Sequence, residues 1–293
     1  MFRFCAWLVS FGLLLAPVAE ARGRGGPHFE VDRSKICAYN IGFTSVFSLF
    51  SAVAQHQVKS WRDVVRHIAI GAGAGAGYYQ AKRLTGDGHV TAGWLLTNAT
   101  ASILENTTGG ERLFGRVGYT VGPLRFRVAT PLARTAIARI EADWSLVETG
   151  SFWLAIKKGS HVHWRNGLIA VDRDAPWPDP DIKGNTFLGN TFGVFPGVSP
   201  PAAPVIWHHE AIHAVQRQQF DSIEPPFFTF LKDEHELRPR RLFVFRHVRA
   251  GFGQALDLPT TNRNYHRRWY EIEAYALAER CPVLVVRGNF SCR

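Results

Sequence analysis

Cysteine and methionine are scarce in this chain of 293 residues, which contains four cysteines and one methionine. Cys5 lies near the N-terminus, and Cys37, Cys281 and Cys292 are scattered over the rest of the chain. This scatter excludes a cluster of thiolates around zinc, because such clusters need pairs of ligands a few residues apart. For an oxidising compartment, the three later cysteines predict one disulfide and one free thiol, and all three pairings stay open.

Acidic residues are also few, with 24 Asp and Glu against 34 Lys and Arg, which gives a formal net charge of +10. Such a balance favours anionic neighbours, including an anionic membrane or envelope surface. The sequence carries no motif typical of nucleic-acid recognition, so we expect no nucleic acid as partner.

Residues 1–21 have the organisation of a secretory signal peptide. A basic start at Arg3 leads into an apolar stretch from Phe4 to Val18, and Ala19-Glu20-Ala21 forms a small-x-small cleavage site. No cysteine stands at the first position after that site, so the pattern does not predict a lipoprotein. We expect an exported protein, periplasmic or secreted, with a retained membrane anchor as the alternative.

The first third after the signal is predicted to be helical. Residues 22–35 are basic and rich in glycine, and we expect them to be flexible. Residues 36–110 contain apolar runs and the alternating segment Gly71–Gly77, where small residues allow two helix backbones to approach closely. The apolar runs are shorter than the roughly 20 residues that span a bilayer. A packed helical region and membrane-embedded hairpins are both open interpretations, and the first is favoured.

Residues 111–293 begin after Gly109-Gly110 and change to short β-like runs. We expect a strand–turn–strand over 117–128, a short helix over 134–145, a meander that includes 161–171, and a strand-like segment from Gly184 to Phe195. The expected fold class is therefore α+β, with a small mixed sheet after a helical N-terminal region.

The segment that carries chemistry is His209-Glu210-x-x-His213, an HExxH pattern. Residues four apart on a helix share one face, so both imidazoles can bind one metal ion. Two such ligands suit Zn²⁺, and Glu210 lies where its carboxylate can take a proton from a water molecule. His208 is turned about 100° away from His209 and is not expected to be a ligand.

Two histidines alone hold zinc weakly, so the site needs a further protein ligand. The predicted helix from Trp269 to Glu279 offers Glu271 and Glu273. These two side chains lie about 200° apart on a helix, so only one of them can face the metal. Both remain candidates from the sequence, with Glu271 favoured.

With these residues the chain resembles the zincin metallopeptidases, in which a small sheet precedes the helix that carries HExxH. In the gluzincin branch the third ligand is a Glu on a later helix, followed four residues on by an acidic residue that orients a ligand histidine. That resemblance implies Glu271 as the ligand. It puts Tyr275 in the place of the usual Asp, where the tyrosine hydroxyl would have to take the orienting role.

Two further features belong to the same resemblance. Gln216 makes the motif similar to HExxHxxQ in a group of bacterial proteins described as peptidases. The resemblance also implies a strand beside the cleft that pairs with substrate, for which residues 184–195 are the candidate.

The sequence thus predicts an exported zinc peptidase that acts on peptides or proteins, with Glu210 as general base. Side chains that are candidates for orienting a ligand or for stabilising the transition state are His235, Tyr265, His266, Tyr270 and Tyr275. The alternatives are a zinc-binding module without activity and a membrane-associated protein in which the HExxH pattern is accidental.

Overall fold

The structure is a computed structural model that describes a defined part of the chain. The described residues are 33–121, 124–133, 139–142, 159–165, 168–173, 184–187, 191–194, 203–223, 234–237, 243–246, 269–278, 283–286 and 289–292. The predicted signal peptide at 1–21 and most of the basic segment at 22–35 lie outside these residues. The expectation that this segment is flexible is wrong at residues 33–35, which form the start of the helix Arg33–Ala54.

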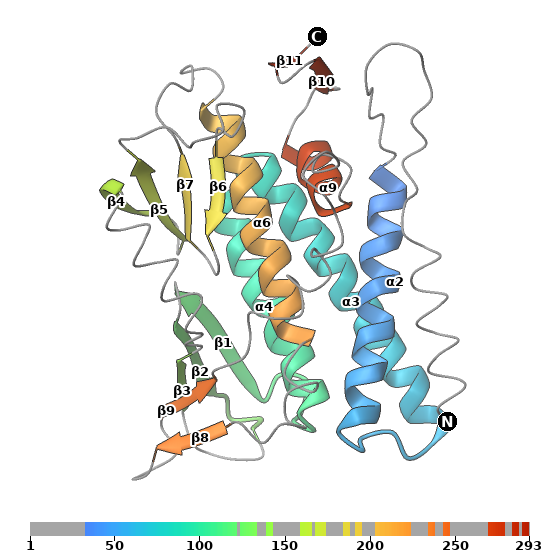
Figure 1. The fold of residues 1–293 in the computed structure, drawn as a ribbon. Helices are drawn as coiled ribbons and strands as arrows, with labels where there is room; N and C mark the ends of the chain where they lie inside the picture. Colours follow the sequence, from blue (N-terminus) through green and yellow to red (C-terminus); the bar gives the residue numbers. More distant parts are fainter. Residues whose placement is uncertain are drawn as a thin grey trace.

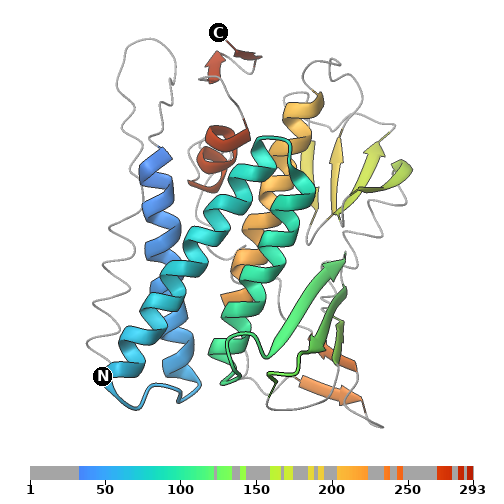
Figure 2. The ribbon, with the colours of Figure 1, turned by 180° about the vertical axis from the view of Figure 1, so that it is seen from behind.

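Helices form the centre of the molecule (Figure 1). They are α2 (Arg33–Ala54), α3 (Trp61–Gly86), α4 (Val90–Thr108), α6 (Ala203–Ile223) and α9 (Trp269–Ala278). The long helix α3 packs against each of the other four. Seen from behind, α3 and α4 run side by side in front of α6 (Figure 2). The HExxH segment lies on α6, which makes α3 and α4 its structural support.

Local sequence explains where α3 begins and ends. Ser60 is its N-cap: the Asp63 N–H donates to Ser60 Oγ at 3.3 Å, and the Ser60 N–H donates to Asp63 Oδ2 at 2.9 Å. This reciprocal pair satisfies two backbone donors that have no partner within the helix. The turn that follows α3 contains Gly88 at φ +89°, in the left-handed region that glycine adopts without strain.

Glycines of α3 bring neighbouring helices close together. A Cβ on Gly71 would lie 2.6 Å from the Ser45 Cα of α2, and a Cβ on Gly77 would lie 2.6 Å from the Thr100 Oγ1 of α4. The segment predicted to allow close helix contact therefore does so on two sides of α3.

A matched pair of substitutions tests this packing. Gly71→Ala is expected to lower the free energy of unfolding by about 1–3 kcal/mol, because backbone atoms of α2 must move to admit the methyl group. A Cβ on Gly73 would have no described atom within 4 Å, so Gly73→Ala should stabilise the helix by up to about 1 kcal/mol. Chemical denaturation of both variants measures the difference, and equal midpoints would contradict the close α2–α3 contact.

Two sheets lie on the other side of α6 from α2 and α9 (Figure 1). One has the order β1-β2-β3-β9-β8, built from β1 (Arg116–Val121), β2 (Leu124–Ala129), β3 (Arg139–Ala142), β9 (Phe243–Arg246) and β8 (Glu234–Leu237). The other has the order β4-β5-β7-β6, built from β4 (Gly159–Arg165), β5 (Leu168–Arg173), β7 (Thr191–Val194) and β6 (Gly184–Phe187). Both sheets are mixed, since β3 pairs parallel with β9 and β5 pairs parallel with β7. A separate hairpin joins β10 (Val283–Val286) and β11 (Asn289–Cys292).

One element that the sequence predicted as a helix contains a strand. The helix predicted over residues 134–145 is wrong at 139–142, which form the strand β3. This segment pairs antiparallel with β2 and parallel with β9, which lies about a hundred residues further along the chain. Its helical periodicity is overridden because the two neighbouring strands offer partners on both edges.

The helical N-terminal region and α6 share a hydrophobic core. Ala211, Ala214 and Val215 of α6 pack into one cluster with buried residues of α3 and α4, including Tyr78 and Trp94. The sequence indicated a boundary after residue 110, and α4 ends just before it, at Thr108, with Gly109 as its C-cap and Gly110 next at φ +74°. Residues before and after position 110 nevertheless contribute to one core, so the boundary along the chain does not coincide with a boundary between hydrophobic clusters.

Among the described helices, α2 is long and apolar enough to cross a membrane, with 22 residues. Its most apolar stretch is 44% buried inside the molecule. Core helices of soluble proteins and membrane-spanning helices can both have this length and apolar composition. Helix α2 therefore does not distinguish the two interpretations of the N-terminal region. Cys37 on α2 carries a free thiol, whereas Cys281 lies outside the described residues.

Candidate metal centre

Helix α6 presents the HExxH residues to one place. Ala211 and Ile212 are buried on its inner side, which fixes the rotation of the helix against the core. His209 and His213 then lie one turn apart on the same face, with their ring centroids 4.7 Å from each other. The two Nε2 atoms are 3.0 Å apart, so the imidazoles converge on a common point.

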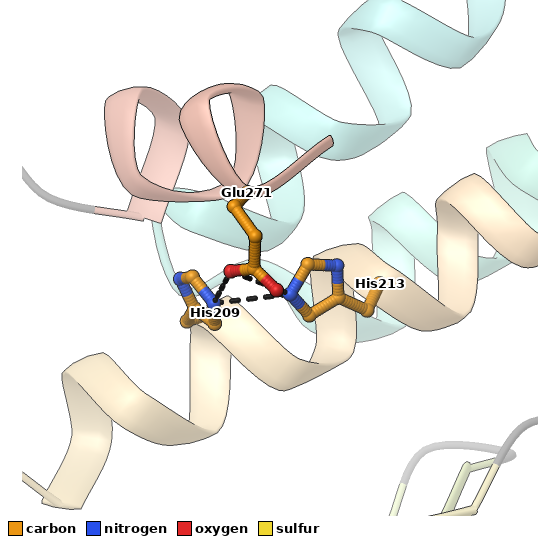
Figure 3. A group of neighbouring side chains, drawn as sticks. All are labelled: His209, His213 and Glu271. Carbon is orange, nitrogen blue, oxygen red and sulfur yellow. Dashed lines mark hydrogen bonds and ion pairs between the residues drawn. The ribbon is translucent and has the colours of Figure 1, made fainter. Parts of the chain in front are cut away.

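Helix α9 supplies a carboxylate at that point. Glu271 projects from α9 between the two imidazole rings (Figure 3). Its Oε2 lies 3.2 Å from His209 Nε2 and 3.4 Å from His213 Nε2. Glu271 is 1% exposed and His209 is 8% exposed, so the group is shielded from bulk solvent.

The spacing of these three atoms fits a zinc ion. Ligand atoms about 2.1 Å from zinc at the corners of a tetrahedron lie about 3.4 Å from one another. The three distances at the site, 3.0, 3.2 and 3.4 Å, are close to that edge length. Two imidazole nitrogens and one carboxylate oxygen are also ligands that zinc accepts, and the fourth corner is left for a non-protein ligand.

The electrostatics favour a positive charge between the three groups. Burial lowers the pKa of His213, but the charge and hydrogen bond of Glu271, with a smaller contribution from Glu210, raise its pKa to about 9. Burial likewise works to raise the pKa of the Glu271 carboxyl, but the two histidines hold that pKa well below its usual range. A buried carboxylate and two imidazoles in this arrangement stabilise a cation, either a proton or a metal ion.

Glu273, the alternative ligand, faces a different group of residues. Its Oε2 accepts hydrogen bonds from Lys82 Nζ at 2.8 Å and Gln216 Nε2 at 2.7 Å, and its Oε1 accepts from Asn40 Nδ2 at 2.6 Å. It is buried on the side of α9 turned toward α3 and α2. Of the two acidic residues of α9, Glu271 therefore contacts the histidine pair and Glu273 contacts the buried Lys82.

Gln216 connects these two groups. Its Oε1 lies 2.7 Å from His213 Nδ1, and its Nε2 also donates to the backbone carbonyl of Tyr270 at 2.9 Å. The Tyr270 ring lies edge-on to His213 with a centroid distance of 5.7 Å. Gln216 thus contacts Nδ1 of His213, the ring nitrogen that faces away from Glu271 and His209.

Tyr275 contacts His209 through its ring. The two ring centroids are 4.4 Å apart with an interplanar angle of 47°. His209 Nδ1 is buried and has no hydrogen-bond partner among the described residues, so the hydroxyl of Tyr275 does not orient this nitrogen in the way that the usual Asp would. Tyr275 instead limits the rotation of the His209 ring by packing.

Glu210 and His208 differ in their surroundings. Glu210 is buried and close enough to His213 for its charge to raise the pKa of that histidine. His208 is half-buried, and its ring lies beside the turn after α3, where a Cβ on Gly88 would be 3.4 Å from His208 Cε1. His208 is therefore not part of the group formed by the ligand candidates.

The remaining candidates are not brought to the group by any described contact. Tyr265 and His266 lie outside the described residues. His235 belongs to β8, the outer strand of the five-stranded sheet. Strand β8 and helix α9 lie at opposite ends of the molecule in both views (Figures 1 and 2).

Sequence reasoning missed the polar residues behind the site, which are Asn40, Lys82 and Gln219. One signal was present for Gln219, which follows His213 and Gln216 at helical spacing. Lys82 had no such signal, since a lysine among small residues usually lies at the surface of a helix. Its burial at 0% exposure follows from the packing of α2, α3, α6 and α9 around it.

In the part of the chain that the structure describes, His209, His213 and Glu271 are the one group of three or more metal-binding side chains whose ligand atoms lie within 4.8 Å of one another. The group joins α6 to α9 across 62 residues of sequence. No protein-family model, curated protein or solved structure matches the chain.

Proposed function

We propose that this protein is an exported zinc-dependent peptidase, in which His209, His213 and Glu271 hold the metal. The observation that carries the proposal is the convergence of three ligand atoms at 3.0 to 3.4 Å from one another, from helices far apart in sequence. A cation stabilises such a buried arrangement of two imidazoles and a carboxylate, and a zinc ion bound by all three groups would supply that charge. The neighbouring carboxylate of Glu210 adds the group that a hydrolase requires and that a structural zinc site does not.

Zinc bound by these residues would supply Lewis acidity, lowering the pKa of a water molecule and polarising a peptide carbonyl. Glu210 accepts a proton from the attacking water molecule while the water oxygen forms a bond to the carbonyl carbon. The same carboxyl then donates that proton to the amide nitrogen as the carbon–nitrogen bond breaks. The immediate products are a carboxylic acid and an amine, which become a carboxylate and an ammonium group when the acid proton moves to the amine, and Glu210 returns to its ionised form.

The proposal includes a zincin-like arrangement and a peptide substrate. Residues 184–195, the candidate for a substrate-binding strand, contain β6 and β7, and β6 is an outer strand of its sheet. Both strands pack against α6, and β6 lies next to it (Figure 1). An outer strand beside the HExxH helix supports the proposal because an extended peptide can add to the edge of a sheet. The net charge of +10 supports an anionic envelope or membrane surface as its surroundings.

Metal content tests the ligand set directly. We expect the purified protein to hold one zinc ion, and His213→Ala and Glu271→Ala each to lose it, because two remaining ligands bind zinc weakly. His208→Ala is the matched control, a neighbouring histidine of α6 that is outside the group, and it should keep the metal. Elemental analysis after gel filtration measures the ratio of zinc to protein.

The same preparations test the reaction. Hydrolysis of unstructured protein substrates should disappear when a chelator removes the metal and return when zinc is added. Zinc that is absent from the wild-type protein, or retained at the wild-type ratio in His213→Ala, would contradict the site. Stoichiometric zinc without hydrolysis of any peptide pool would favour the zinc-binding module without activity.

A further inference from the structure

We propose that Gln216 is the positioning residue that makes His213 a metal ligand, and that a buried network from the N-terminal helices, through Lys82 and Glu273, holds Gln216 in place. The inference rests on the proposed metal site and adds to it the control of the ligand by the chain's own residues. It assigns a role to α2 and α3, which the HExxH motif does not include.

The surroundings of Gln216 fix the orientation of its side-chain amide. Its nitrogen has two protons, and two acceptors lie beside it: the Tyr270 carbonyl at 2.9 Å and the Glu273 carboxylate at 2.7 Å. The opposite orientation would place the amide oxygen against both of these oxygens, with no proton between them. The network therefore permits one orientation only, which directs Oε1 toward His213.

The orientation of Gln216 determines the tautomer of His213. Since the Gln216 oxygen is an acceptor, the His213 nitrogen 2.7 Å away must donate, so Nδ1 carries the proton. In a neutral imidazole the other nitrogen, Nε2, then has a free electron pair. This is the nitrogen that faces Glu271 and His209, and it is the one needed to bind the metal.

Glu273 is itself fixed by hydrogen bonds to both of its carboxylate oxygens. Its carboxylate accepts from Lys82, Asn40 and Gln216, and Lys82 donates its other two protons to Asn40 Oδ1 at 2.8 Å and Gln219 Oε1 at 2.7 Å. All three protons of the ammonium group thus have acceptors. A buried network in which each member is satisfied has one low-energy arrangement, because rotating any side chain leaves a buried polar group unpaired.

The network ends on helix α2. Gln219 Nε2 donates to Thr44 Oγ1 at 2.9 Å, and Asn40 Nδ2 also donates to the backbone carbonyl of Ile36 at 2.9 Å. Both acceptors belong to α2, one turn on either side of Asn40. The N-terminal helices therefore fix the side chains that in turn fix Gln216.

The two ligand histidines are consequently held in different ways. His213 has a hydrogen-bonded support that extends through α6 and α9 to α2 and α3. His209 Nδ1 has no hydrogen-bond partner in the described part of the chain, and the ring packs against Tyr275. The zincin resemblance gave a hydrogen-bonding role to the residue at position 275. In this proposal Gln216 takes that role, and the histidine that it orients is His213.

The tautomer can be measured in the unaltered full-length protein. In the zinc-loaded form, a long-range ¹H–¹⁵N correlation spectrum should show His213 with a protonated Nδ1 and a metal-bound Nε2. A His213 that carries its proton on Nε2 would overturn the inference, whatever the protein hydrolyses. This measurement needs no variant and does not depend on how well a substituted chain folds.

Substitution of the glutamine gives the second measurement. Gln216→Leu should weaken zinc affinity by about 10- to 100-fold, the loss typical when a metal-bound histidine loses its hydrogen-bonding partner. Gln218→Leu is the matched control, since Gln218 is a buried glutamine of the same helix whose Nε2 has no hydrogen-bond partner among the described residues. Its zinc affinity should stay close to the wild-type value.

Competition with a chromophoric chelator measures these affinities, with far-ultraviolet circular dichroism as the check on folding. Equal affinities for the two variants would overturn the inference while leaving the proposed function intact. A wild-type protein without zinc would overturn both. Loss of peptide hydrolysis with unchanged zinc affinity in Gln216→Leu would also count against the inference, because it places Gln216 in a different role.

Discussion

Glu210→Gln is expected to abolish peptide hydrolysis while the protein keeps its zinc. The amide has the size of the carboxyl group but cannot accept the proton that the attacking water must lose. General-base catalysis contributes about 10²- to 10⁴-fold, so kcat should fall by at least about 10²-fold. Zinc content should be unchanged, because the three ligand atoms belong to other residues. Assays of turnover and of bound metal on one preparation separate the two effects.

The control for this variant is His208→Ala, which should retain both zinc and turnover. His208 lies on the same helix, beside the turn after α3 and outside the ligand group. Turnover by Glu210→Gln at the wild-type rate would exclude Glu210 as the base. Loss of zinc from Glu210→Gln would show instead that this carboxylate supports the metal.

Lys82→Met is expected to lower the free energy of unfolding by about 3–5 kcal/mol, the usual cost of removing one partner from a buried ion pair. Lys82 Nζ and Glu273 Oε2 are 2.8 Å apart, with side chains 0% and 1% exposed. Methionine fills a similar volume but leaves the carboxylate of Glu273 buried without its counter-charge. Denaturant unfolding followed by circular dichroism measures the loss.

Arg83→Met is the matched control for this second prediction. Arg83 is the next residue of α3, and it makes a surface pair with Asp87 at 3.9 Å, with the Arg83 side chain 51% exposed. Such exposed pairs contribute about 0–1 kcal/mol, so Arg83→Met should unfold almost like the wild-type protein. Adding Glu273→Gln to Lys82→Met should recover part of the loss, because no unpaired charge then remains buried. Similar losses for Lys82→Met and Arg83→Met would contradict a buried ion pair.

Local sequence patterns predicted the elements that depend on neighbouring residues. The helices within residues 36–108 and the β1–β2 hairpin follow from apolar periodicity and from turns. The strand β3 was missed because its partners β2 and β9 come from both sides of it in the chain, and β9 is distant in sequence. A residue's own neighbours do not encode that parallel pairing.

The sequence by itself determined that His209 and His213 share a face of one helix, because 3.6 residues per turn places residues four apart together. It also determined that Glu271 and Glu273 point in different directions, by the same geometry. Which of the two meets the histidines was decided by the tertiary structure alone. The rotation of α9 follows from the burial of its apolar side and from the ion pair of Glu273 with Lys82, and these contacts join residues far apart in the chain. Helical periodicity has no information about such contacts, since they exist only when α2, α3, α6 and α9 pack together.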